Sequence, residues 1–280
     1  MRAKTIQIFL PDGSPRSIRI AEITSRIAKV ILIPRNKLEE AMNREELQNV
    51  GMYFLFGSSD EKAKDLVYIG EAENCLRRLK QHNAKKDFWN TALVVVSKTN
   101  SFTKSHVKYL ENFAYKKAKE IGRYEVVNDV IPTESFIPEW MQADLMDVFE
   151  SIKILLGTLG YPLFEEVHGE LSEQETFICK GKEACATGEY TDDGLVVYKG
   201  STANIEEART AVGSWVSNMR TKLLNSGVLE QKENVYIFTS DYVFSSPSAA
   251  AAAVLGRRAN GWTEWKDKDG RTLDELKRKN

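Results

Sequence analysis

The stretch GMYFLFGSSDEKAKDLVYIG, residues 51–70, decides the fold of the first half of the chain. Apolar residues fill positions 52–56 and again 66–69, and the polar segment 57–65 between them has the Gly, Ser and Asp residues of a loop. Two apolar runs joined this closely are expected to pair as antiparallel strands. We therefore predict a strand pair, followed by a helix that begins near Glu73.

The residues around this stretch extend the prediction. A β-branched run at 92–97 predicts a third strand, and residues 103–121 have the length and period of a long helix with Gly122 at its C-terminal cap. These elements predict a mixed α/β (α+β) domain over 48–130, built as a small antiparallel three-stranded sheet flanked by helices. Residues 1–47 alternate apolar and polar positions, which predicts an N-terminal β-hairpin extension.

Charge is distributed unevenly along the chain, although the whole has a net charge of −1. Residues 1–130 have 23 basic and 16 acidic side chains (+7), residues 131–200 have 4 and 14 (−10), and residues 201–280 have 12 and 10 (+2). Solvated surface charge is the ordinary explanation, but a basic first half also fits a chain that meets phosphates there. We expect an acidic linker at 131–194 and a smaller α+β domain at 195–280.

Composition argues against several classes of protein. No run approaches the ~18 uninterrupted apolar residues of a membrane helix, and the first residues do not form a signal peptide. The three cysteines form no CxxC pair, and His82, His106 and His168 are too scattered for a structural zinc site, which needs about four ligands. We expect a reduced, cytoplasmic protein without zinc and without a membrane partner.

Two predicted helices contain side chains suited to phosphate chemistry, which needs an acid, a base and positive charge in one place. Glu111 lies on the buried stripe of Val107 and Ala114, so its carboxylate should point inward. Such a carboxylate needs either a basic partner or a divalent cation, and the pattern favours neither. Arg78 and His82 are four residues apart and share a helix face, where they could meet a phosphate.

In these residues the sequence resembles the GIY-YIG nuclease superfamily, over roughly residues 48–130. Met52 replaces the usual isoleucine, and Glu71 stands where certain relatives have a lysine. The motif elements correspond to Gly51-Met52-Tyr53, Tyr68-Ile69-Gly70, Arg78, Glu111 and the closing asparagine Asn128.

The resemblance implies a role for each site residue. Glu111 would hold one Mg²⁺ or Mn²⁺, and Arg78 would bind the scissile phosphate. Either Tyr53 or Tyr68 would orient or deprotonate the attacking water, with help from His82. A free tyrosine with a pKa near 10 is a poor base at pH 7, so either the metal and Arg78 lower that pKa or His82 shares the task. The sequence leaves both questions open.

The leading prediction is a metal-dependent endonuclease that hydrolyses phosphodiester bonds of nucleic acid, with DNA the expected substrate. The alternatives are a catalytically inactive nucleic-acid-binding module that retains the fold, and a protein-interaction scaffold that uses the acidic segment.

Residues 195–280 resemble a domain of unknown function that often follows this nuclease. Trp262 and Trp265 in it are expected to pack in a core rather than stack on bases. Its basic residues suggest an auxiliary DNA contact: Arg257, Arg258, Lys266, Lys268 and Arg271.

Overall fold

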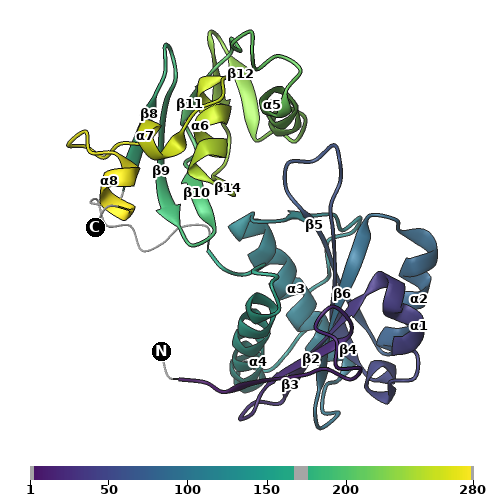
Figure 1. Ribbon diagram of the computed structural model, residues 1–280. Helices are drawn as coiled ribbons and strands as arrows, with labels where there is room; N and C mark the ends of the chain where they lie inside the picture. Colours follow the sequence, from purple (N-terminus) through teal and green to yellow (C-terminus); the bar gives the residue numbers. More distant parts are fainter. Residues whose placement is uncertain (1–2, 167–175, 279–280) are drawn as a thin grey trace. The chain divides into compact units, whose positions relative to one another are not determined.

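The computed structural model describes residues 3–166 and 176–278 (Figure 1). His168 and part of the expected linker lie outside the described residues. The chain divides into two compact units: Met1–Ser59 with Lys64–Glu165, and Asp60–Ala63 with Glu166–Asn280.

A single seven-stranded sheet forms the centre of the first unit, in the order β1-β2-β3-β6-β4-β5-β7. The prediction of a small three-stranded sheet is wrong in its extent. Its three strands correspond to β4, β5 and β6, but β6 also pairs with β3 over seven residues, so the N-terminal strands continue the same sheet. The strands are β1 (Ile6–Phe9), β2 (Arg19–Ile23), β3 (Ala28–Pro34), β4 (Gly51–Gly57), β5 (Leu66–Ala72), β6 (Trp89–Ser97) and β7 (Glu125–Val126).

The physical reason for the larger sheet lies in β6. All but one of its residues are buried. As an edge strand it would expose a row of unpaired backbone groups beside a run of valines, which invites further pairing. Pairing with β3 covers that edge, from Ala28 opposite Ser97 to Pro34 opposite Thr91.

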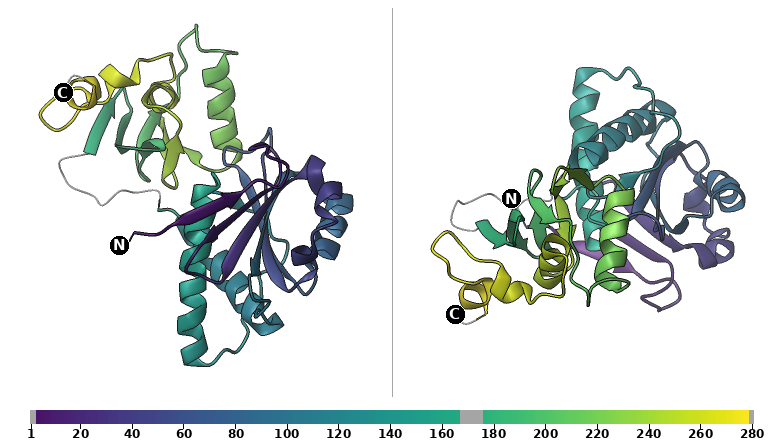
Figure 2. Two further views of the ribbon diagram at one scale, coloured as in Figure 1. Left: turned by 60° about the horizontal axis from the view of Figure 1, so that its bottom comes forward. Right: turned by 90° about the horizontal axis from the view of Figure 1, so that it is seen from above.

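Helices cover both faces of this sheet, as the views of Figures 1 and 2 show. Alternate residues of β4 point to opposite faces of the sheet. Phe54 packs in the core between the sheet and helices α3 and α4, and Tyr53 packs in the core between the sheet and helices α1 and α2. Such alternation follows from the two-residue period of a strand. The helices are α1 (Leu38–Ala41), α2 (Cys75–Lys85), α3 (Lys104–Ile121) and α4 (Glu139–Thr158), with short 3-10 turns η1 (Arg35–Lys37) and η2 (Glu45–Gln48).

Residues 131–194, expected as an acidic linker, contain helix α4 and two strands of the second unit. The helix is amphipathic: Leu145, Phe149 and Ile152 are buried in the core of the first unit, and the acidic Asp144 and Asp147 are exposed. The acidic residues of α4 thus lie on the solvent-exposed face of a helix that packs on the first unit, so this part of the segment is not a linker.

In its described residues, the second unit contains two small sheets and four helices. A four-stranded sheet has the order β14-β10-β9-β8, and a three-stranded sheet the order β11-β13-β12. The strands are β8 (Thr176–Lys180), β9 (Cys185–Thr191), β10 (Gly194–Val197), β11 (Thr202–Asn204), β12 (Leu229–Lys232), β13 (Val235–Phe238) and β14 (Tyr242–Phe244). The helices are α5 (Trp215–Asn225), α6 (Pro247–Leu255), α7 (Gly261–Glu264) and α8 (Leu273–Lys277).

Helix α6 holds this second core together. Its cap Ser246 accepts a hydrogen bond from the Ala249 backbone, with a proline in the first turn, and its alanines are largely buried. A Cβ at Gly261 would lie 2.0 Å from backbone atoms of Pro247, so α6 and α7 approach closely. Trp265 is fully buried and its indole donates to the Pro247 carbonyl, which confirms the expected core packing of this tryptophan.

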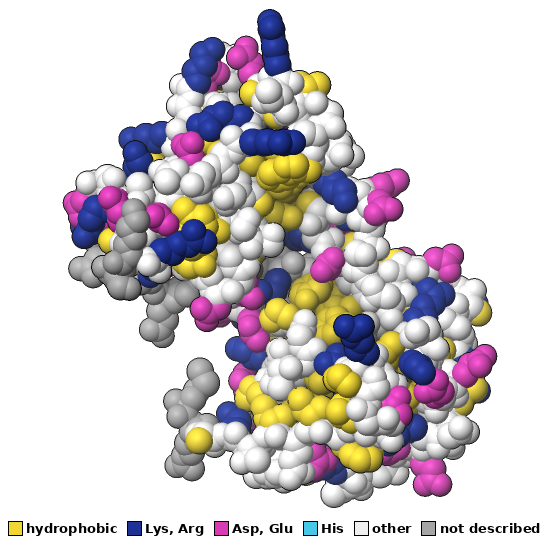
Figure 3. All heavy atoms as spheres, in the orientation of Figure 1, with side chains coloured by type: hydrophobic (Ala, Val, Ile, Leu, Met, Phe, Trp, Pro, Cys, Tyr) yellow, Lys and Arg dark blue, Asp and Glu magenta, His cyan; other side chains and the backbone are white. Residues whose placement is uncertain are grey.

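Within the described residues, no helix has the length and apolar character needed to cross a membrane. On the face shown in Figure 3, basic and acidic side chains are interspersed over both units, with apolar side chains between them.

Candidate functional site

Close packing requires glycine at positions 51 and 70, in the tripeptides Gly51-Met52-Tyr53 and Tyr68-Ile69-Gly70. Tyr53 on β4 pairs directly with Gly70 on β5. A Cβ at position 70 would lie 2.2 Å from the Tyr53 hydroxyl oxygen, so the phenol ring crosses the space that a side chain would fill. A Cβ at Gly51 would lie 2.4 Å from the Val95 carbonyl oxygen and 2.9 Å from the Cys75 sulfur. Only glycine fits at either position without displacing its neighbours.

Helix α2 brings an imidazole and a guanidinium to the Tyr53 hydroxyl. Asn74 begins the helix by accepting a hydrogen bond from the Arg77 backbone. The Tyr53 oxygen lies 2.8 Å from His82 Nε2 and 3.2 Å from Arg78 Nε. Since a guanidinium only donates, Arg78 donates to the phenol oxygen. The phenol donates to His82 Nε2 in the tautomer of His82 that has its proton on Nδ1.

Burial sets the charge states of this group. It lowers the pKa of His82 to about 4, assisted by the charges of Arg78 and Lys86, so the imidazole is neutral at pH 7 and can accept a proton. Burial also raises the pKa of Tyr53, which the hydrogen bond from Arg78 opposes. Tyr53 is therefore un-ionised at pH 7, and neutral His82 is the acceptor beside it.

Tyr68 joins the same group from β5 through its ring and its hydroxyl. Its ring lies 6.2 Å from that of Tyr53 and 5.0 Å from that of His82, and Lys86 Nζ lies 4.7 Å from the ring centre. Hydrogen bonds to Tyr53 and then to Tyr68 raise the pKa of Arg78. Tyr53 is fully buried and Tyr68 half-buried, so Tyr68 is the phenol closer to solvent.

Glu111 lies on α3 at the edge of β5. A capping box of Thr103 and His106 starts this helix, and Gly122 in the left-handed conformation ends it. Burial and, to a smaller extent, the charge of Glu71 raise the pKa of Glu111 to about 7, against the opposing effects of a hydrogen bond from the Glu71 backbone and of the charges of Lys104 and Lys108. Among the described residues, no lysine or arginine forms an ion pair with Glu111.

Asn128 holds the backbone of β5. Its Oδ1 accepts a hydrogen bond from the Ile69 N–H at 3.0 Å and its Nδ2 donates to the Ile69 carbonyl at 2.7 Å. The Val127 N–H likewise donates to the Val67 carbonyl, so Asn128 continues the pairing of β7 along β5. Both polar atoms of the Asn128 side chain thus bond to the backbone of β5, one residue after Tyr68.

A pocket of about 350 Å³ opens beside Arg78. Arg78 donates to the Gln81 side chain at 3.1 Å, and Lys104 Nζ lies 2.8 Å from a carboxylate oxygen of Glu71. Sequence reasoning did not single out Lys104, although it precedes Glu111 by two helical turns and so shares its face. The pocket is lined by Glu71, Ala72, Glu73, Asn74, Arg77, Arg78, Gln81 and Lys104.

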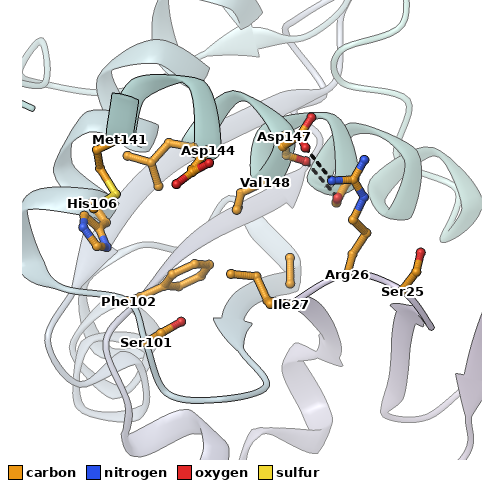
Figure 4. Close-up of a pocket in the computed structure, with 13 residues that line it drawn as sticks. Ser25, Arg26, Ile27, Ser101, Phe102, His106, Met141, Asp144, Asp147 and Val148 are labelled. Atoms are coloured by element: carbon orange, nitrogen blue, oxygen red, sulfur yellow. Dashed lines mark hydrogen bonds and ion pairs between the residues drawn. The ribbon is translucent and has the colours of Figure 1, made fainter. Parts of the chain in front are cut away.

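A larger pocket of about 510 Å³ lies elsewhere in the first unit, between the β2–β3 turn, the start of α3, and α4 (Figure 4). Its lining is mainly apolar, with the ion pair of Arg26 and Asp147 at one end and His106 at the other. The ring of His106 is engaged in the capping box of α3. The smaller pocket is lined by Arg78, whose guanidinium bonds to the Tyr53 hydroxyl, and is therefore the better candidate for chemistry despite its size.

Comparison with protein families identifies the domain to which these residues belong. Residues 50–125 match the family model described as the GIY-YIG catalytic domain. These residues form a GIY-YIG domain. The domain belongs to a nuclease superfamily, and the match includes Tyr53, Tyr68, Arg78, His82 and Glu111; Asn128 lies just beyond its end. No match was found among curated proteins or among solved structures.

C-terminal to the GIY-YIG domain, residues 177–277 match the domain of unknown function DUF4357. The match extends from β8 to α8 and starts before residue 195, where the sequence analysis placed the domain. The reason is structural, because β9 pairs with β10 and β8 pairs with β9 in one sheet.

Proposed function

We propose that the protein is a metal-dependent endonuclease that hydrolyses phosphodiester bonds of nucleic acid, with DNA as the expected substrate. The hydrogen-bonded chain from Arg78 through Tyr53 to His82 supports this most directly. It places a permanent cation, a phenol and a neutral imidazole in one group beside a polar pocket.

The pocket suits a phosphate group. Arg77, Arg78 and Lys104 contribute positive charge to its lining. A guanidinium has five N–H donors, and Arg78 uses Nε for Tyr53 and Nη1 for Gln81, so it has donors to spare for phosphate oxygens. Arg78 could therefore bind a phosphate of the substrate while it donates to the Tyr53 hydroxyl.

Glu111 fits a divalent cation. Its carboxylate is partly buried, and burial disfavours its charge, which an adjacent cation would stabilise. Mg²⁺ and Mn²⁺ take oxygen ligands of this kind and keep several waters. Bound there, either ion would supply charge neutralisation at the phosphate and an activated water. We therefore infer that Glu111 holds one Mg²⁺ or Mn²⁺.

We assign proton transfer to Tyr53 and His82. The pKa of Tyr53 is too high for it to act alone at pH 7, whereas neutral His82 lies 2.8 Å from its hydroxyl oxygen and can take its proton. As the Tyr53 proton passes to His82, Arg78 stabilises the negative charge that develops on the phenol oxygen, and that oxygen then takes the proton of the nucleophile.

Nicking of supercoiled plasmid DNA with Mg²⁺ or Mn²⁺ tests this proposal. We expect the full chain to nick, and Glu111→Gln and Arg78→Ala each to lower the rate by about 100-fold or more. Glu120→Gln is the matched control, since Glu120 is an exposed carboxylate on the same helix, paired with Lys117. Nicking that survives both site substitutions would contradict the assignment. Absent nicking with intact DNA binding would favour the inactive binding module.

The DUF4357 domain is proposed as an auxiliary DNA contact. Several of its basic residues already meet acids: Arg257 pairs with Glu264, and Arg271 pairs with Asp267. We therefore expect a modest contribution. Deletion must begin near residue 166, because a cut at 195 would divide the β8–β9–β10 sheet. Affinity for duplex DNA should fall at matched salt, and unchanged affinity would rule the contact out.

A further inference from the structure

An ion pair at the pocket has no part in the proposed chemistry. Glu71 is the last polar residue of β5, directly after Gly70, and its carboxylate lies 2.8 Å from Lys104 Nζ in the first turn of α3. Both side chains line the pocket that also contains Arg78. The ion pair thus connects strand β5 to helix α3 beside the residues proposed for catalysis.

The two partners differ in exposure. The Lys104 side chain is 41% exposed and that of Glu71 13% exposed. The ammonium is therefore open to solvent at the pocket, with the carboxylate behind it. An ammonium has three donors, so Lys104 can contact Glu71 and a further acceptor together.

The charge arrangement explains why a lysine is needed there. An unpaired carboxylate at position 71 would repel a phosphate in the pocket, and Lys104 neutralises it at short range. Arg78 enters the same pocket from α2, and Lys104 enters it from α3. A phosphate seated there would have a cation on each of two elements.

We propose that Lys104 is a second phosphate contact of the GIY-YIG site, together with Arg78, and that Glu71 positions its ammonium. The inference rests on the proposed function, since it assigns a substrate contact within the same pocket. Lys104 forms this contact from helix α3 and is not among the site residues that the sequence analysis named.

The test measures binding of a fluorescein-labelled DNA duplex by anisotropy, with the full chain in a Glu111→Gln background that prevents cleavage. Lys104→Met keeps the apolar stem and removes the charge. We expect it to weaken binding roughly three- to tenfold and to reduce the slope of log affinity against log salt by about 1. Lys117→Met on the same helix is the control, expected to change neither quantity.

Removal of Lys104 alone would also leave Glu71 unneutralised, so the decisive comparison is made in a Glu71→Gln background. If Lys104 touches phosphate, Glu71→Gln/Lys104→Met binds more weakly than Glu71→Gln by a similar factor. Equal affinity of these two variants would mean that Lys104 only neutralises Glu71, and the proposal would be overturned. If Glu71→Gln does not fold, Glu71→Ala takes its place as the background for the same comparison with and without Lys104→Met.

The outcomes separate this inference from the proposed function. Plasmid nicking by the full chain, together with normal binding by Lys104→Met, would remove only the Lys104 contact. Weakened binding by Lys104→Met in a chain that never nicks would leave Lys104 as a phosphate contact and reject the nuclease.

Discussion

Replacement of Gly70 by alanine tests the packing on which the whole site depends. The added Cβ would lie 2.2 Å from the Tyr53 hydroxyl oxygen and 2.3 Å from Cζ of the same ring. Ordinary contacts to a Cβ begin near 3.4 Å, so the ring must move by about 1 Å or more. Tyr53 is fully buried, so its ring can move only by displacing the side chains packed around it.

The expected cost follows from that displacement. Overpacking a filled core destabilises by roughly 1–3 kcal/mol, which corresponds to a fall of roughly 2–12 °C in Tm for a unit of this size. The phenol oxygen would also leave hydrogen-bond range of His82 and Arg78. Misplacement of a catalytic group by about 1 Å can lower a rate by about 100-fold. We therefore expect the nicking rate of Gly70→Ala to fall by about this factor even at temperatures where the variant remains folded.

The assay compares Gly70→Ala, Tyr53→Ala and the double variant by thermal unfolding and plasmid nicking. Tyr53→Ala alone leaves a cavity, which the methyl group added at position 70 partly fills, so the double variant should be more stable than the sum of the two losses predicts. Strict additivity, or an unchanged Tm in Gly70→Ala, would show that the phenol does not cover position 70.

Three further predictions follow from the site. Tyr53→Phe should lower nicking by about 100-fold or more and Tyr68→Phe by less, as measured by initial rates, because the Tyr53 hydroxyl bonds directly to the His82 imidazole. Equal losses in the two variants would contradict this assignment. Glu111 has a pKa raised to about 7 and is protonated below it, so Mn²⁺ affinity by calorimetry should fall about tenfold per pH unit below 7; a flat profile would be inconsistent. Asn128→Ala removes both hydrogen bonds to Ile69 and should cost roughly 1–3 kcal/mol in denaturant unfolding, and an unchanged midpoint would show that other contacts hold β5.

Local patterns explain which elements could be predicted. The strands around 52–56, 66–69 and 92–97 and the helix around 103–121 depend on apolar periodicity and on capping residues that are close in sequence. The extent of the sheet could not be predicted in this way. Pairing of β3 with β6 joins segments that are far apart in the sequence, and no local pattern specifies a partner.

The prediction of a linker at residues 131–194, which rested on composition, was wrong for the part that forms α4. The acidic count of residues 131–194 suggested a linker, whereas α4 buries Leu145, Phe149 and Ile152 in the first core. Net charge sums all faces of a helix, so it conceals an apolar stripe that burial reveals.

The sequence by itself determined that residues 51–128 contain two phenols, a guanidinium, an imidazole and a carboxylate in the order of a GIY-YIG nuclease, since residue order is a property of the chain. Only the tertiary structure decided which atoms meet. It placed the Tyr53 hydroxyl beside His82 Nε2, bonded Asn128 to a strand backbone, and brought Lys104 to Glu71. Hydrogen bonds and ion pairs act over a few ångströms, and those separations depend on how distant segments pack together.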